Sequence, residues 1–249
     1  MPRWLILSPF LLTLACSSGT TPAPPAMEPT KPAPVPTVGP EPAERPTKPA
    51  PKTRWTPKEQ ALAAAGLEAV APGPGLRVAL VYATAKNFTG QVLYTDLHHC
   101  FLRPEAARKL RAAAAALQAR HPDRSLLVAD CARPLSIQRL LWRLHPNPAH
   151  VANPEAGASA HNHGCAVDLT LASDAGALEM GTGLDEFSAG ARLTVTAEPA
   201  LCREGLLHPT ACANRRLLRE VMTASGFEPY AGEWWHFSGC DRDRFEVIP

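Results

Sequence analysis

The chain has 249 residues, and its 25 lysine and arginine side chains nearly balance its 23 aspartate and glutamate side chains, for a formal net charge of +2. This balance argues against a nucleic-acid-binding protein, because such proteins usually carry a concentrated basic excess. Proline is unevenly distributed, since 15 of the 27 prolines lie in residues 1–57. Residues 58–249 are long enough to form one domain with its own hydrophobic core.

The N-terminal segment, residues 1–15, has the pattern of a secretory signal peptide. Arg3 is followed by an apolar run that ends at Ala15, and this run is shorter than the ~20 residues of a transmembrane helix. Cys16 follows directly, so we expect cleavage before Cys16 and lipid attachment to its thiol. Thr13 stands where lipoprotein signals usually have leucine, which leaves ordinary secretion as the alternative.

Residues 16–57 are mostly proline, alanine, threonine and lysine, and they have no apolar periodicity. Such a segment cannot bury a core, so we predict a disordered linker. With a lipid on Cys16, it would tether the folded domain, residues 58–249, to the periplasmic side of a bacterial membrane, the outer membrane included. A plain spacer is favoured over a proline-rich ligand for a specific partner.

Seven segments of the domain have the apolar spacing of regular secondary structure. Helical spacing occurs in residues 104–120, 135–144 and 214–225. Runs rich in β-branched, apolar or aromatic residues predict strands at 77–83, 125–131, 166–171 and 233–237. Gly226 is placed to end the third helix. Helices mixed with a few separated strands indicate an α+β fold.

The domain also contains an even number of cysteines: Cys100, Cys131, Cys165, Cys202, Cys212 and Cys240. Six cysteines in an exported domain suggest up to three disulfide bonds. Cys202 and Cys212 close a short loop and are the pair that we expect. The sequence does not select among the other pairings.

One motif with metal-binding chemistry is Ser159-Ala-His161-Asn-His-Gly164-Cys-Ala-Val-Asp168. Imidazole nitrogen and carboxylate oxygen are both good zinc ligands. Gly164 permits a sharp bend that would bring His161 back beside Asp168. Taken alone, the motif is weak evidence for a metal site, and a polar loop that enters a strand is the favoured alternative.

A second motif is Glu233-Trp-Trp-His236. A carboxylate and an imidazole three residues apart are typical of a general base beside a metal ligand, and the two tryptophan rings would wall the site against water. The alternative is a set of core aromatic residues with a surface glutamate. A third motif, Asp130-Cys-Ala-Arg133-Pro, follows a predicted strand. Arg133 could stabilise an oxyanion there, or it could be a surface arginine at a turn.

Together, in this order, the three motifs resemble those of the zinc D-alanyl-D-alanine dipeptidases, the family that includes the vancomycin-resistance dipeptidase. The segments Tyr82-Ala-Thr-Ala-Lys-Asn-Phe88 and Met180-Gly-Thr-Gly-Leu-Asp185 also match motifs of that family, and the similarity extends over most of residues 76–240. The resemblance implies a single zinc-peptidase domain with a small antiparallel sheet flanked by helices.

The resemblance implies one Zn²⁺ per chain, bound by His161, Asp168 and His236. Glu233 would be the general base for a metal-activated water, and Arg133 would support the oxyanion. The implied reaction is the hydrolysis of D-Ala-D-Ala or related small peptides in cell-wall turnover.

The family positions that bind the substrate or brace the pocket correspond to Asp185, Tyr82, Ser159 and Asp130. Asp185 would pair with the free ammonium of the dipeptide. Three departures from the family pattern, Ala132, His163 and Leu184, put the strictness for D-Ala-D-Ala in doubt. The alternatives are a peptidoglycan D,D-carboxypeptidase or endopeptidase of the same superfamily, and a non-catalytic zinc-stabilised module that binds the cell wall.

Overall fold

The structure is a computed structural model that describes residues 54–186 and 197–249. The expected signal peptide, Cys16 and the linker up to residue 53 lie outside the described residues. No helix within the two described ranges is long and apolar enough to cross a membrane. The first described helix, α1 (Pro57–Ala64), begins in a capping box in which Thr56 and Glu59 each accept a backbone N–H of the other.

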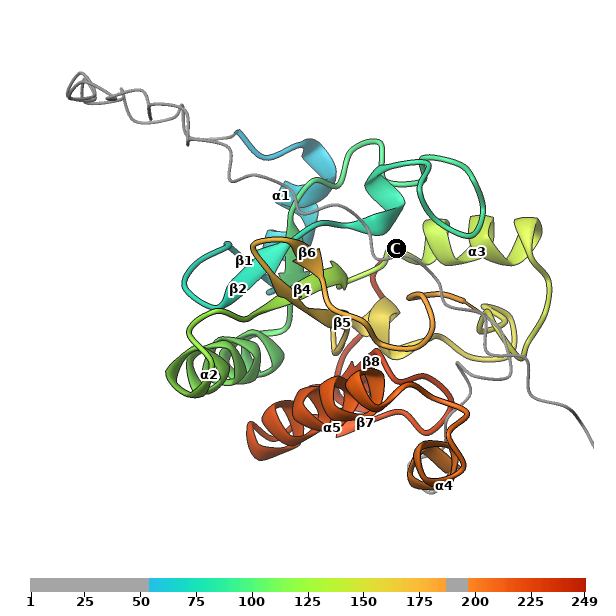
Figure 1. Ribbon diagram of the computed structural model, residues 1–249. Helices are drawn as coiled ribbons and strands as arrows, with labels where there is room; N and C mark the ends of the chain where they lie inside the picture. The colour runs from blue at the N-terminus through green and yellow to red at the C-terminus, as the bar shows by residue number, and fades with distance from the viewer. Residues whose placement is uncertain (1–53, 187–196) are drawn as a thin grey trace, which may run out of the picture. The chain divides into compact units, whose positions relative to one another are not determined.

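The central sheet has the strand order β2-β4-β5-β8-β7, and β6 pairs with β5 (Figure 1). Its strands are β2 (Leu76–Val78), β4 (Ser125–Asp130), β5 (Ala166–Ser173), β6 (Gly176–Ala177), β7 (Glu228–Pro229) and β8 (His236–Ser238). All pairings in this sheet are antiparallel except that of β2 with β4. This parallel pair is connected through a helix, as parallel neighbours require. A separate antiparallel pair joins β1 (Glu68–Val70) to β3 (Cys100–Leu102).

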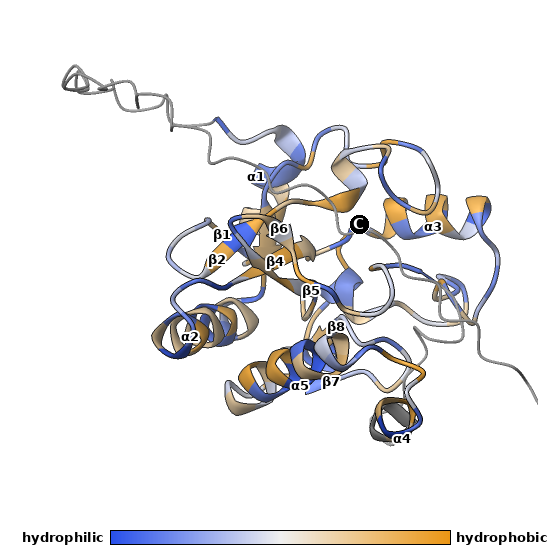
Figure 2. Cartoon of the chain, in the orientation of Figure 1, coloured by the Kyte–Doolittle hydropathy of each residue, from blue (hydrophilic) through white to orange (hydrophobic). Residues whose placement is uncertain are grey.

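Two long helices, α2 (Pro104–Arg120) and α5 (Pro209–Ala224), contact each other and one face of the sheet (Figure 1). Both carry hydrophobic and hydrophilic residues along their length (Figure 2). The buried stripe of α2 consists largely of alanine, which lets the helix approach the sheet closely. The remaining helical elements are α3 (Leu135–Leu144), α4 (Ala197–Arg203) and the 3₁₀ turns η1 (Val81–Ala83), η2 (Ala160–His163) and η3 (Arg242–Arg244).

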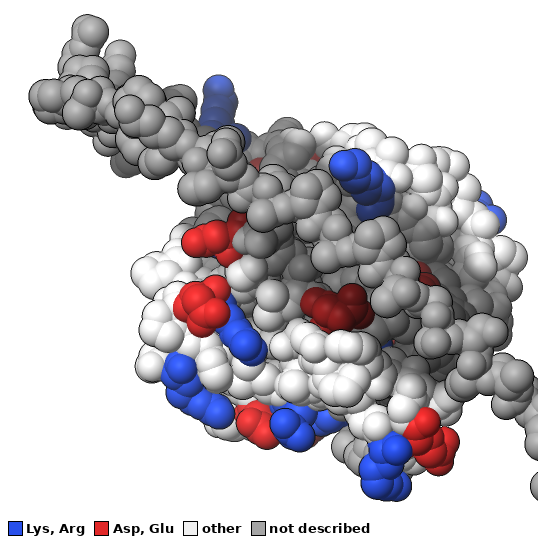
Figure 3. Space-filling model, viewed as in Figure 1, with Lys and Arg blue, Asp and Glu red and all other residues white. Residues whose placement is uncertain are grey.

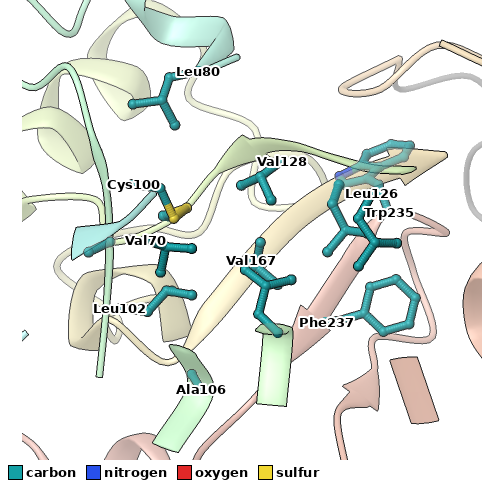
Figure 4. Close-up of a cluster of buried hydrophobic side chains, with 14 of the residues drawn as sticks. Val70, Leu80, Cys100, Leu102, Ala106, Leu126, Val128, Val167, Trp235 and Phe237 are labelled. Carbon is teal, nitrogen blue, oxygen red and sulfur yellow. A yellow bond between two sulfur atoms is a disulfide. The ribbon is translucent and has the colours of Figure 1, made fainter. Parts of the chain in front are cut away.

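Beneath α2 and α5, the hydrophobic core is built by neighbouring strands of the sheet. Val128 of β4, Val167 of β5 and Phe237 of β8 are buried in one cluster (Figure 4). Successive side chains of a strand project to opposite faces. Asp168 and His236, which are adjacent in sequence to Val167 and Phe237, therefore project to the face that α2 and α5 do not cover.

The α+β fold class is confirmed, and two of the predicted helices, 104–120 and 135–144, have the predicted bounds. The third predicted helix begins earlier, at Pro209. Proline suits the first helical position, and the ring of His208 accepts the N–H of Thr210 as a cap.

Two predicted strands are shorter than expected. The strand expected at 77–83 ends at Val78. The chain then turns through η1, where the carbonyl of Tyr82 accepts the N–H groups of Leu93 and Tyr94. In the segment 233–237, only the residues from His236 onward are in a strand, because the preceding residues form a turn.

The six cysteines of the domain form three disulfide bonds. The structure pairs Cys202 with Cys212, which is the expected pair. The other two bonds are Cys100–Cys131 and Cys165–Cys240. The first links β3 to the residue that follows β4, and the second links the segment before β5 to the segment after β8. The first therefore joins the β1–β3 pair to the central sheet, and the second joins two segments that flank the central sheet and are distant in sequence.

Candidate functional site

The sheet register places three acidic and imidazole side chains in one row. Asp130 at the end of β4 is opposite Asp168 of β5, and Asp168 is opposite His236 of β8. Directly opposed residues on neighbouring strands project to the same face. The register of β4 against β5 shifts at a β-bulge between Val128 and Asp130, and this shift places Asp130 opposite Asp168.

His161 reaches this row from the turn η2. The side chain of Ser159 caps the turn by accepting the N–H of His161 at 3.3 Å. Gly164 ends the turn with φ 72°, a left-handed conformation that favours glycine. A Cβ atom at this position would also lie 2.7 Å from the side chain of Leu67. Glycine is thus favoured here by the backbone conformation, and a larger residue would also have to displace the end of the Leu67 side chain.

His161, Asp168 and His236 present one ligand atom each within 4.8 Å of one another. The Nε2 atom of His161 lies 3.2 Å from Asp168 Oδ2, and the Nδ1 atom of His236 lies 3.0 Å from Asp168 Oδ1. The two ring nitrogens are 3.1 Å apart. Within the described ranges, this is the only group of three or more histidine, cysteine or acidic side chains with metal-binding geometry.

Two of the three groups, His236 and Asp168, already favour the protonation state that binds a divalent cation. His161 Nδ1 lies 2.7 Å from the carbonyl oxygen of Cys131 and donates to it, so its Nε2 lone pair faces Asp168. Burial lowers the pKa of His236 and favours its neutral, ligating form. Burial alone would raise the pKa of Asp168, but His161 and His236 hold it well below its usual value. Burial lowers the pKa of His161 as well, but the charge of Asp168 outweighs burial and the net shift of the His161 pKa is upward. A divalent cation in the site would displace that proton, and two neutral imidazoles with a carboxylate form a typical catalytic zinc set.

Glu233 lies beside this set without joining it. Its Oε2 atom is 3.9 Å from the Nδ1 atom of His236. Burial, and then the negative charge of Asp168, raise the pKa of Glu233 to about 8. A carboxyl group with a pKa near neutrality can both accept and return a proton, whereas a bound cation would lower this pKa.

Arg133 is held by a network behind the metal-binding set. Its Nε atom donates to Asp130 Oδ2 at 2.9 Å, and its Nη1 atom donates to Gln138 at 2.9 Å. Tyr94 donates its hydroxyl to the other oxygen of Asp130 at 2.6 Å. The Nη2 atom of Arg133 lies 3.8 Å from Asp168 Oδ2. The guanidinium group is therefore fixed next to the candidate metal site.

Asp185, which is partly buried, and the buried Tyr82 form a second acidic position. The Tyr82 hydroxyl donates to Asp185 Oδ2 at 2.8 Å. Burial, and then the charge of Asp168, raise the pKa of Asp185 to about 7. Asp185 is also the one non-glycine residue with positive φ, 58°, in the described part of the chain. Such strain is typical of functional positions.

These side chains surround a cavity of about 560 Å³. Figure 3 shows acidic side chains recessed in a hollow of this face. The predicted site residues that line the cavity are Tyr82, Arg133, Ser159, His161, Asp168, Asp185, Glu233 and His236. Asp130 does not line it, because it is completely buried beneath Arg133.

Several features of the cavity differ from the sequence-based interpretation. Trp234 and Trp235, which were expected to wall the site, do not line it. Trp235 belongs to the hydrophobic core. The lining residues that were not predicted include Gln138, Tyr230 and Arg242. Of these three, only Gln138 had a sequence signal, because it is a polar residue on the apolar face of the helix predicted at 135–144.

The three departures from the family motifs leave the metal-binding set intact. Ala132 is buried and donates its N–H to the carbonyl of Phe101. The Nδ1 atom of His163 lies 2.7 Å from the carbonyl oxygen of Phe245, away from the cavity. Leu184 packs against the hydrophobic core.

Comparisons with known proteins agree with the similarity of the motifs. A family profile described as D-Ala-D-Ala dipeptidase matches residues 64–247. The chain is 34% identical over 165 residues to the D-alanyl-D-alanine dipeptidase of Escherichia coli, covering 66% of this chain and 79% of the relative. It is 32% identical over 190 residues to the enzyme of that name from Enterococcus faecalis, covering 67% and 87% of the two chains. The Streptomyces coelicolor protein of that name is 32% identical over 187 residues, 66% of this chain and 86% of the relative.

Proposed function

Because the chain belongs to the D-Ala-D-Ala dipeptidase family of peptidases, we propose that it hydrolyses D-Ala-D-Ala with one Zn²⁺ bound by His161, Asp168 and His236. The observation that carries this proposal is the convergence of these three ligand atoms within 4.8 Å. The donor set supports zinc because it combines two imidazoles with one carboxylate and leaves a position open for substrate.

The zinc ion supplies electrophilic polarisation of the peptide carbonyl and makes water more acidic. Glu233 accepts the proton as the water oxygen bonds to the carbonyl carbon, and it delivers that proton to the amide nitrogen as the C–N bond breaks. The products are two molecules of D-alanine. Arg133 donates to the carbonyl oxygen as negative charge develops on it, and its bonds to Asp130 and Gln138 hold it in place.

Asp185 supports a preference for a dipeptide. Its side chain is partly buried at the cavity, where the hydroxyl of Tyr82 donates to one of its carboxylate oxygens. The free ammonium of a dipeptide would neutralise this carboxylate. A longer peptide has an amide in that place and would leave the partly buried charge unpaired, which penalises its binding.

A substrate panel with and without a chelator tests the proposal. We expect hydrolysis of D-Ala-D-Ala, little hydrolysis of L-Ala-L-Ala or of a pentapeptide that ends in D-Ala-D-Ala, complete loss with a chelator, and recovery with added Zn²⁺. Amino-acid release measured by chromatography is the readout. Preference for the pentapeptide would support a D,D-carboxypeptidase or endopeptidase instead. A zinc-loaded protein that cleaves no substrate would support a non-catalytic module.

We further propose that the protein is exported and is anchored through a lipid on Cys16 to the periplasmic side of a bacterial membrane, where it acts in cell-wall peptide turnover. The apolar run before Cys16 and the proline-rich segment after it support this location. The full chain is expected in the membrane fraction, and Cys16→Ala is expected to release it, whereas Ser17→Ala is not. If immunoblots find the full chain, Cys16→Ala and Ser17→Ala in the same cell fraction, the lipid anchor on Cys16 is refuted.

A further inference from the structure

The cavity combines several acidic groups with only two arginine or lysine side chains. Among the described residues that line it, these two are Arg133 and Arg242. Arg133 is engaged by Asp130 and Gln138 and lies next to the candidate metal site. Arg242 comes from a different part of the chain, the turn η3, and neither the metal-binding set nor the mechanism proposed above uses it.

The position of Arg242 is fixed by a hydrogen bond to another segment of the cavity lining. Its Nη1 atom donates to the carbonyl oxygen of Ala158 at 2.8 Å. The side chain of Asp241 accepts the N–H of Asp243 and caps the turn that carries Arg242. The Nε atom of Arg242 lies 3.7 Å from Asp243, whose side chain is 85% exposed, so that ion pair is weak. The Nη2 edge of the guanidinium group has no hydrogen bond to the described residues.

Arg242 and Asp185 both line the cavity, and they contact different residues of its lining. Asp185 is bonded to Tyr82, and the guanidinium group of Arg133 lies 5.2 Å from the ring of Tyr82. Arg242 instead contacts Ala158, and it lines the cavity together with Tyr230, whose ring lies 5.6 Å from that of His236.

A dipeptide is a zwitterion, so a site that binds its ammonium also needs a cation for its carboxylate. If Asp185 binds the ammonium, as in the proposed function on which this inference rests, the carboxylate requires a partner on the other side of the scissile bond. An arginine offers two parallel N–H groups that match the two oxygens of a carboxylate. We propose that Arg242 binds the C-terminal carboxylate of the substrate and makes a free C-terminus part of the specificity.

The size of the effect follows from the exposure of Arg242. Its side chain is 51% exposed, so water and salt weaken any ion pair that it makes. The carboxylate does not change during hydrolysis, and Arg242 therefore binds the ground state and the transition state equally. Loss of such uniform binding raises KM and leaves kcat unchanged. We expect an increase in KM of about 5-fold for a half-exposed ion pair.

The experiment compares Arg242→Gln with Arg244→Gln in the zinc-loaded full chain. Arg244 lies on the same turn, is 62% exposed and does not line the cavity, so its substitution removes the same charge. The substrates are D-Ala-D-Ala and its C-terminal amide. We expect Arg242→Gln to raise KM for the dipeptide but not for the amide, Arg242→Lys to restore part of the affinity, and Arg244→Gln to change neither substrate.

Two results would overturn this inference. An unchanged KM for D-Ala-D-Ala in Arg242→Gln would show that the carboxylate is bound elsewhere. An equal loss with the dipeptide and the amide would show that Arg242 acts through its bond to Ala158, by positioning the segment that leads to His161. Either result can be interpreted only if the unsubstituted protein hydrolyses D-Ala-D-Ala. Lack of that activity is a failure of the proposed function, and the substrate panel detects it separately.

Discussion

Substitution of Glu233 by Gln is expected to reduce kcat for D-Ala-D-Ala by about 10²–10⁴-fold, the contribution typical of a positioned general base. Glutamine has nearly the same shape but cannot accept the proton of the attacking water. The zinc content is expected to stay at one ion per chain, because Glu233 lies 3.9 Å from the ligating nitrogen of His236 and is outside the metal-binding set. Steady-state kinetics and metal analysis of the same preparation provide the two measurements.

Glu228→Gln is the matched control for this variant. Glu228 is exposed on β7, five residues earlier in the chain, and does not line the cavity. Its substitution removes the same charge and is expected to leave kcat unchanged. Full activity in Glu233→Gln would refute the role of Glu233, and loss of zinc in that variant would show that Glu233 is a ligand.

Removal of the Cys165–Cys240 disulfide is expected to weaken zinc binding by about 10–100-fold, the range found when groups that orient metal ligands are lost. Cys165 lies between the ligands His161 and Asp168, and Cys240 follows His236 by four residues. The N–H of Gly239 also donates to the carbonyl of Cys165 at 2.7 Å. The disulfide therefore fastens to each other the segments that carry the three proposed ligands. The measurement is the zinc Kd of Cys165→Ala/Cys240→Ala, by competition with a chromophoric chelator.

The Cys202–Cys212 bond is the matched control, because it links α4 to α5 and neither cysteine lines the cavity. Loss of any disulfide lowers the free energy of unfolding, and a longer closed loop has the larger effect. Both double variants are therefore compared at a temperature where circular dichroism shows that they are folded. Equal zinc affinities in the two variants would contradict the orienting role of the Cys165–Cys240 bond.

The long helices and the types of the site residues could be predicted from the sequence, because each depends on local patterns. The apolar spacing in 104–120 is sufficient to define α2. The strands β1, β3 and β7 could not be predicted in this way, because they have only two or three residues and too few positions for a period to be visible. They are stabilised by partners distant in sequence.

The wrong expectation for the tryptophan pair has a simple physical cause. An extended segment directs adjacent residues to opposite faces. His236 faces the cavity, so its neighbour Trp235 faces the core. This alternation does not account for Trp234, which lies in the turn before β8 and donates its Nε1–H to the hydroxyl of Thr182. Arg242 and Tyr230 could not have been predicted as cavity residues, because their positions depend on contacts such as that of Arg242 with Ala158, 84 residues away.

The row of Asp130, Asp168 and His236 across β4, β5 and β8 connects cation binding to the correct assembly of the sheet. A slip of β8 by one residue would put Trp235 or Phe237 opposite Asp168 and turn His236 into the interior. A misaligned chain would then lack the complete set of donors. An ion that binds only the properly paired strands shifts the folding equilibrium toward them by mass action. The cation would thus favour the correct register of the strands while the chain folds, before any peptide binds.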